Sequence, residues 1–259
     1  IYIYMFSSNE IITGEKIQLE CDYFIGNSGC VRNPKIHNEA QDKFLTNNMV
    51  NTDFDNKTNI YCYTHTLNSG ELVSILSKFR NEFNLFCHNS DGSFDEKHLN
   101  LFSKIPKLRL VYTQNKNVIH DRVKIIPIGI ANSQWGHGNL QCWDNLNFDK
   151  LLKTKDYFFN FKIATNKSKR QECYDIIKNK NIGWTKGSHY SNYLNILKQY
   201  KFAFCPEGNG IDTHRFWECI YLKVVPITLR NHLVEELQKD IPVLILEKWE
   251  DFDAAKIIN

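Results

Sequence analysis

Short apolar segments alternate with amphipathic segments through the first half of the chain. Residues 71–83 carry Leu72, Ile75, Leu76 and Phe79 at helical spacing, so they are expected to form a helix between two strands. A second, shorter helix is expected near residues 96–102. The expected strands are residues 16–25, 59–65, 84–88, 108–112 and 123–128. This alternation predicts an α/β fold, in which helices cover a mostly parallel sheet.

The second half of the chain repeats the same pattern. The expected strands are residues 157–163, 201–205, 224–228 and 242–246, and the expected helices are 169–178, 190–200 and 213–222. A polar stretch rich in Asn, Gly, Gln and Trp, residues 129–147, separates the halves. We therefore expect two Rossmann-like domains, residues 1–147 and 148–259, with a ligand bound between them at the carboxyl ends of the strands.

Composition excludes several classes of protein. Among the 259 residues, 42% are hydrophobic and 24% charged, which is ordinary globular usage and argues against a disordered or coiled-coil chain. A net charge of +3 argues against a dedicated nucleic-acid-binding protein. No apolar run approaches the roughly 18 residues that a membrane-spanning helix needs.

The eight cysteines bear on the cellular compartment. No two are spaced as Cys-x-x-Cys, and several lie inside apolar segments such as 61–63, 85–87 and 202–205. There a cysteine behaves as a small buried hydrophobic residue. We expect reduced thiols and a cytoplasmic protein, because disulfides are rare in that compartment.

The stretch 204–218 has the residues of a phosphate-binding turn. An apolar strand ends at Pro206, and Gly208 and Gly210 allow the backbone to approach a ligand closely. Either Asp212 or Thr213 can then cap a helix, whose free amide groups suit a phosphate.

Two charged residues follow in that helix. Arg215 offers two parallel hydrogen bonds to phosphate oxygens, and Glu218, one turn later, can accept hydrogen bonds from ribose hydroxyls. The combination favours a nucleoside-diphosphate site. The alternative is an ordinary strand–turn–helix with an exposed Arg–Glu pair on the helix surface.

This stretch, with the following Val224-Val-Pro-Ile227, resembles the donor-site motif of exostosin-type glycosyltransferases. Residues 160–170 resemble the strand, loop and arginine that open the donor domain of that family. Residues 88–91 and 126–135 are similar to compact members from bacteria and large DNA viruses, including algal-virus enzymes that build capsid glycans. The resemblance implies a GT-B fold, with a nucleotide-sugar donor in the second domain and an acceptor in the first.

The resemblance also implies site residues. Donor contacts are expected from Thr165, Arg170, Glu207, Gly208, Asn209, Gly210, Asp212, Thr213, Arg215 and Glu218. Two positions depart from the family motif. Glu207 stands where animal exostosins often have Arg, and Lys223 replaces the usual Gly before the Val-Pro-Ile strand.

A catalytic base is expected from the first domain, at the carboxyl end of a strand. Asp91 is the first candidate and His65 the second, although either residue can instead fix a turn. Acceptor contacts are expected from His88, Asn89, Trp135 and His137, with interdomain packing as the alternative role of Trp135.

The expected reaction is transfer of a sugar, xylose or another sugar linked to UDP, from a nucleotide-diphosphate donor to a hydroxyl of a glycan or glycoprotein. A GDP-sugar is the second candidate donor. We expect an inverting enzyme without metal or other cofactor, in the host cytoplasm if the protein is viral. The triplets Asp53-Phe-Asp55 and Asp251-Phe-Asp253 resemble metal-binding pairs, but neither follows a central apolar strand. The alternative is a non-catalytic nucleotide- or glycan-binding module on the same scaffold.

Overall fold

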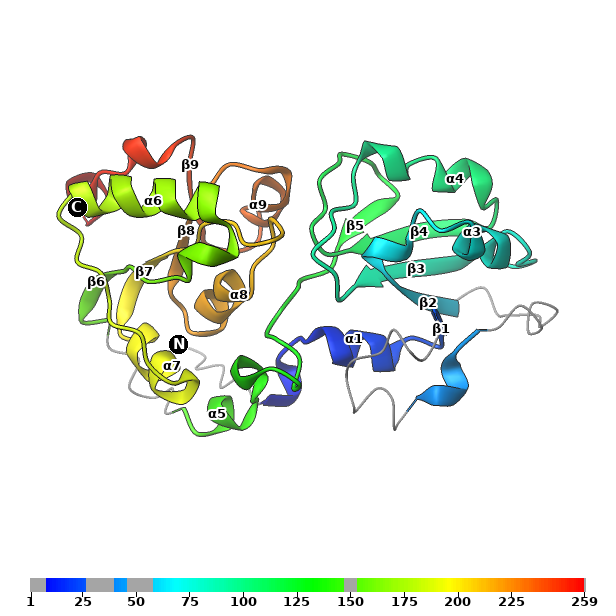
Figure 1. Ribbon diagram of the computed structural model, residues 1–259, viewed down its shortest axis with the longest axis horizontal. Coiled ribbons are helices and arrows are strands. Elements are labelled where there is room, and N and C mark those ends of the chain that lie inside the picture. The colour runs from blue at the N-terminus through cyan, green and yellow to red at the C-terminus, as the bar shows by residue number, and fades with distance from the viewer. Residues whose placement is uncertain (1–7, 27–39, 46–57, 147–152, 259) are drawn as a thin grey trace. The chain divides into compact units, whose positions relative to one another are not determined.

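The computed structural model describes residues 8–26, 40–45, 58–146 and 153–258 (Figure 1). The chain divides into two compact units. The first unit is Ile12–Gln134, and the second unit runs from Trp135 onward and also includes the segment that ends at Ile11. Residues 135–146, which were expected to close the first domain, thus belong to the second unit. The Asp53–Asp55 triplet lies outside the described residues.

The first unit contains a five-stranded sheet in the order β1-β2-β3-β4-β5, in which every neighbouring pair is parallel. The strands are β1 (Tyr23–Ile25), β2 (Thr58–Tyr63), β3 (Phe83–His88), β4 (Leu108–Thr113) and β5 (Val123–Ile125). The helices are α1 (Gly14–Glu20), α3 (Gly70–Leu76) and α4 (Leu101–Lys104), and the 3-10 turns are η3 (Gln41–Lys43), η5 (Thr64–Thr66) and η6 (Glu96–His98). Leu72, Ile75 and Leu76 of α3 pack into the same core as the apolar residues of β2 and β3. The expected α/β architecture is therefore confirmed for this unit.

The strand expected over residues 16–25 is wrong in its first part, because residues 14–20 form α1. Thr13 caps this helix, since its side-chain oxygen accepts a hydrogen bond from the backbone N–H of Lys16. The buried residues of the helix are Gly14, Glu15 and Gln18, whereas Ile17 is only half-buried. The buried face of α1 is thus made of a glycine and two polar residues at helical spacing. A search for alternating apolar residues does not detect such a helix.

The second unit contains a four-stranded parallel sheet in the order β6-β7-β8-β9. The strands are β6 (Lys155–Phe158), β7 (Tyr200–Phe204), β8 (Val225–Leu229) and β9 (Leu244–Leu246). The helices are α5 (Gln141–Asp144), α6 (Lys167–Asn179), α7 (Tyr190–Leu197), α8 (His214–Tyr221), α9 (His232–Leu237) and α10 (Ala254–Ile258). The 3-10 turns are η1 (Ser8–Glu10), η7 (Gly136–Gly138), η8 (Ile163–Thr165) and η9 (Trp249–Asp251).

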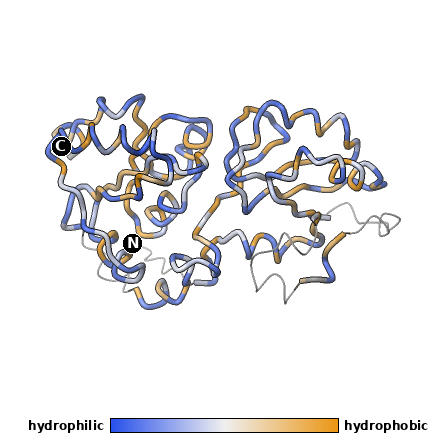
Figure 2. Tube along the Cα trace, viewed as in Figure 1, coloured by the Kyte–Doolittle hydropathy of each residue, from blue (hydrophilic) through white to orange (hydrophobic). Residues whose placement is uncertain are grey.

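Helix α6 is predominantly hydrophilic, as Figure 2 shows, and contacts the core through few residues. Its two buried residues, Cys173 and Ile177, pack with Phe159 and Phe204. The helix therefore presents most of its surface to solvent while its first turn approaches the loops that follow the strands. No helix in the described part of the chain is long and apolar enough to cross a membrane.

Candidate functional site

The loop after β7 forms the expected glycine turn. The backbone N–H of Gly208 donates a hydrogen bond to Gly210 O at 3.0 Å, which closes the turn. Thr213 caps α8, because its side-chain oxygen accepts from the N–H of Phe216 at 3.4 Å. Asp212, the other candidate cap, is buried and instead accepts from the indole N–H of Trp217 at 2.7 Å. The structure thus decides between the two candidate caps.

The first turn of α6 holds the glycine turn in place. Asn166 caps α6, and its side-chain amide also donates to Gly208 O at 2.7 Å. Arg170 Nε donates to Glu207 O at 2.8 Å. A Cβ atom on Gly208 would lie 3.2 Å from Arg170 Nη2, so glycine permits this close approach. Asn166 was not among the expected site residues, although an Asn just before a helical segment is a recognisable cap signal.

Arg170 is held by backbone carbonyl groups rather than by a carboxylate. Besides Glu207 O, it reaches Lys162 O through Nη1 at 2.9 Å, and its guanidinium carbon lies 5.9 Å from the centre of the Phe161 ring. Burial lowers the pKa of Arg170, and the positive charge of nearby Arg215 lowers it further. Two guanidinium groups in a partly buried site repel each other. An anion bound between or beside them relieves this repulsion, so the site favours anion binding.

Arg215 packs against two aromatic rings. Its guanidinium carbon is 5.1 Å from the centre of the Phe158 ring and 4.8 Å from that of Tyr193, which are cation–π distances. Nη1 donates to Asn160 O at 2.6 Å. Burial acts against the charged form, but the oxygens of Tyr193 and Glu218 outweigh it, so the pKa of Arg215 is raised. Arg215 is therefore a permanently charged group in a fixed position.

Glu218 is buried and anchors Arg215. Its Oε2 atom lies 3.4 Å from Arg215 Nε and accepts a hydrogen bond from the Tyr193 hydroxyl at 2.5 Å. Only 4% of the residue is exposed. A ribose contact by Glu218 stays a prediction, and it would require these internal bonds to rearrange. No feature of the sequence marks Tyr193 as the partner of Glu218.

The other expected donor residues surround the turn. Thr165 ends η8, just before the cap of α6, and Asn209 is exposed at the tip of the glycine turn. The structure therefore brings the donor candidates together from three segments: η8 with the start of α6, the turn after β7, and the start of α8 (Figure 1).

Trp135 and His137 lie in the second unit, with the donor candidates. The His137 ring is 6.0 Å from the ring of His214, the first residue of α8, and 6.4 Å from that of Tyr190. Trp135 is 53% exposed. These two expected acceptor contacts thus belong to a different unit from His88 and Asn89.

The candidate bases lie at the carboxyl ends of neighbouring strands of the first unit. His65 follows β2, and its Nδ1 atom is 3.2 Å from Ser90 Oγ, in the loop that follows β3. Asp91 is the next residue of that loop and is exposed; its backbone carbonyl lies 3.5 Å from the Asn115 side-chain amide. The structure therefore brings the two candidates close to one another, and exposure keeps both accessible to a substrate.

His88 is fully buried, in contrast to the exposed candidate bases His65 and Asp91. Its Nε2 atom is 2.9 Å from Pro127 O. Asn89 has a positive φ of 53° and accepts from the Asn132 side-chain amide at 2.9 Å. A Cβ atom on Gly14 would lie 1.8 Å from Asn89 Oδ1. These contacts make His88 and Asn89 part of the buried polar network that joins α1 to the sheet; acceptor binding by them stays a prediction.

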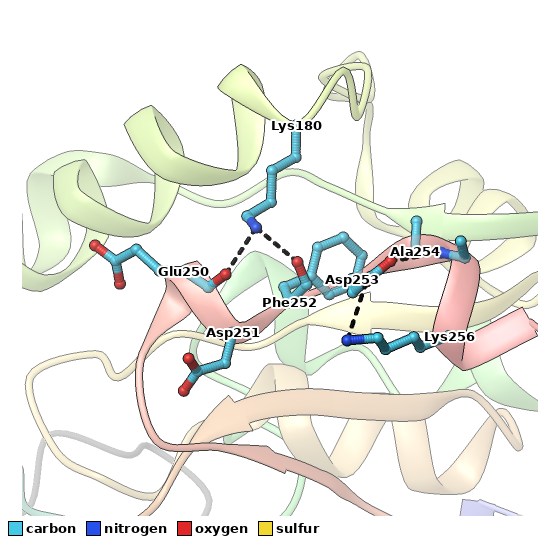
Figure 3. A pocket seen from close by; sticks show the side chains of 8 residues that line it. Lys180, Glu250, Asp251, Phe252, Asp253, Ala254 and Lys256 are labelled. Carbon is cyan, nitrogen blue, oxygen red and sulfur yellow. Dashed lines mark hydrogen bonds and ion pairs between the residues drawn. The ribbon is translucent and has the colours of Figure 1, made fainter.

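A hollow of about 710 Å³ lies elsewhere in the second unit, lined by Lys180 and residues 250–256 (Figure 3). Lys180 Nζ donates to Glu250 O and Phe252 O, each at 2.7 Å, and Lys256 pairs with Asp253 at 3.5 Å. Lys180 and Arg170 are ten residues apart along α6, about 15 Å at 1.5 Å per residue. The hollow is therefore at the opposite end of α6 from Arg170. Lys180 is already bound to two backbone carbonyls and Lys256 to a carboxylate. Asp251 and Asp253 belong to it rather than to the glycine turn.

No protein-family model and no curated protein sequence matches the chain. A pair of fixed guanidinium groups beside a glycine turn can bind a diphosphate, and an exposed carboxylate or imidazole can accept a proton.

Proposed function

We propose that the protein is a glycosyltransferase of the exostosin type with a GT-B arrangement, whose second unit binds the diphosphate of a nucleotide sugar. The observation that carries this proposal is the proximity of two fixed guanidinium groups at the carboxyl ends of neighbouring strands. Arg170 bonds to the glycine turn after β7, Arg215 bonds to Asn160 after β6, and the charge of Arg215 lowers the pKa of Arg170. Parallel α/β sheets bind ligands at that edge. Fixed backbone bonds orient both arginines before a ligand arrives, which lowers the entropic cost of binding.

The arginines have a direct role in the proposed reaction. As the sugar leaves the donor, negative charge develops on the nucleoside diphosphate, and two nearby guanidinium groups stabilise that charge. Asp91, or His65 in its place, removes the proton from the acceptor hydroxyl as the new glycosidic bond forms. The donor sugar is one linked to UDP, with GDP-sugars as the second class, and xylose is one candidate.

Calorimetric titration with UDP and GDP tests the donor site. The Arg215→Ala variant should lose at least tenfold in affinity, because a charged hydrogen bond to phosphate is worth about 1.5–3 kcal/mol. Arg230→Ala is the matched control, since Arg230 lies in the same unit but pairs with Glu235 and Glu247 at the surface. Unchanged affinity in Arg215→Ala would overturn the donor assignment.

Release of UDP from a panel of UDP-sugars tests the enzymatic activity. Release that depends on Arg215 supports the transferase. Binding of UDP without release from any donor sugar, with or without glycan acceptors, would instead indicate a non-catalytic nucleotide-binding module.

A further inference from the structure

Trp184 is an exposed aromatic residue beside the candidate diphosphate site. It lies between α6 and α7, in the short segment Gly183–Gly187, and 40% of its surface is exposed. The rings of Phe159, Phe161 and Tyr174 surround it, with centre-to-centre distances of 4.8, 5.3 and 5.0 Å. All three meet the indole at 79–83°, so none of them stacks in parallel on it.

Hydrogen bonds fix the segment that carries Trp184 to the end of β6. The N–H of Thr185 donates to Phe159 O at 2.7 Å, and the Thr185 hydroxyl accepts from the N–H of Phe159 at 3.3 Å. The Asn160 side-chain amide donates to Thr185 O, also at 2.7 Å. The carbonyl of the same Asn160 holds Arg215. One residue therefore links the exposed indole to a guanidinium of the proposed diphosphate site.

A second link joins Trp184 to Arg170. The Phe161 ring contacts the indole on one side, and the Arg170 guanidinium lies 5.9 Å from the centre of the same ring. The exposed aromatic surface and both cations thus belong to one rigid group of residues. A nucleoside diphosphate has the corresponding chemistry, since a flat base is joined through ribose to two phosphates.

We infer that Trp184 is the stacking platform for the nucleobase of the donor, an inference that rests on the proposed function. Bases stack favourably on exposed aromatic rings, and a ring already held by its neighbours loses little conformational freedom when the ligand binds. Stacking involves the face of the base, so this contact accepts uracil and guanine alike. Discrimination between the two bases then depends on hydrogen bonds at the base edge.

The test compares a ligand that has a base with one that has none. UDP and inorganic pyrophosphate are titrated into the full chain and into Trp184→Ala, Trp184→Phe and Ile119→Ala. Trp184→Ala should lose about tenfold or more in UDP affinity, with pyrophosphate affinity unchanged. Trp184→Phe should keep most of the affinity for UDP. Ile119→Ala, which removes an exposed apolar side chain with no role in the proposed site, should bind both ligands as the wild type does.

Tryptophan fluorescence provides a second measurement. UDP should quench the emission of the wild type, and this quenching should be largely lost in Trp184→Phe. Full UDP affinity in Trp184→Ala, or an equal loss of UDP and pyrophosphate binding, would overturn the stacking role. Failure of the wild type to bind UDP, GDP and pyrophosphate would instead overturn the proposed function.

Discussion

The hydroxyl of Tyr193 donates a hydrogen bond to Glu218 Oε2 at 2.5 Å, while its ring covers the Arg215 guanidinium. One side chain thus contacts both members of the Arg215–Glu218 ion pair. A buried carboxylate requires such donors, because an unpaired charge in this environment is costly. The arrangement presents Arg215 in one orientation, as a residue that recognises a diphosphate requires.

Replacing Tyr193 by Phe separates the two contacts. The Tyr193→Phe variant keeps the ring over Arg215 but leaves Glu218 without its hydroxyl donor, so unfolding free energy should fall by about 1–3 kcal/mol. Urea denaturation measures this change. In the control, Tyr200→Phe, the substituted ring packs on the same Phe158, and we expect a smaller loss. Equal stability of Tyr193→Phe and the wild type would show that the hydroxyl bond does not support the ion pair.

Replacing Asp91 by Asn tests the proposed base. The Asp91→Asn variant cannot accept the acceptor proton, so turnover of the donor sugar should fall by about 10²–10⁴-fold. Affinity for UDP should remain near that of the wild type, because Asp91 belongs to the first unit and the donor residues to the second. Asp121→Asn, at another exposed position of the first unit, is the control. If turnover persists in Asp91→Asn, the same assay on His65→Gln examines the second candidate.

Gly14 offers a test of the buried network around His88 and Asn89. A Cβ atom there would lie 1.8 Å from Asn89 Oδ1 and 2.7 Å from His88 Nδ1, so Gly14→Ala requires both side chains to move. We expect a loss of about 1–3 kcal/mol in unfolding free energy, measured by urea denaturation. The control is Gly70→Ala, at the first residue of α3, where a Cβ atom meets nothing within 4 Å. That variant should be as stable as the wild type or more so.

Buried thiols predict a loss of stability in alkaline solution. Burial raises the pKa of Cys21 to about 12, from an ordinary value of 9. Between these values the unfolded chain releases a proton that the folded chain retains, so the stabilisation present below pH 9 is lost as pH rises toward 12. The urea midpoint should therefore fall over this range, and the fall should be smaller in Cys21→Ala. An identical pH profile for the two proteins would contradict the raised pKa.

The sequence pattern predicts local features better than contacts between distant residues. The strand, glycine turn and helix of residues 200–221 follow from an apolar run, two glycines and a capping threonine, and the structure has all three. The strand expected to reach Ile163 instead ends at Phe158. Beyond it, Phe159 bonds to Thr185 and Asn160 bonds to Arg215. Those partners are far away in the chain, and no periodicity in a short window can reveal them.

Contacts between distant residues also account for the parts of the candidate site that the sequence pattern did not predict. Arg215 and Arg170 could be selected because each belongs to a recognisable motif. Tyr193 and Trp184 lie in segments whose local pattern indicates only a helix and a loop, and their contacts with Glu218 and Phe161 come from tertiary packing. His88 was expected to contact an acceptor, but it is fully buried and lies against Gly14 of α1, a helix that falls mostly within a segment expected to be a strand.

The second unit is built from two separate segments of the chain, and this affects the order in which the chain folds during synthesis. Ser8, which is translated before the whole of the first unit, bonds through its N–H to Asp144 at 3.0 Å, and the rest of its unit begins at Trp135. The intervening residues 12–134 make up the whole of the first unit, so this unit is complete before its neighbour has been translated. Residues 8–11 must therefore wait for α5, and their docking is a late event that joins a segment translated before the first unit to one translated after it.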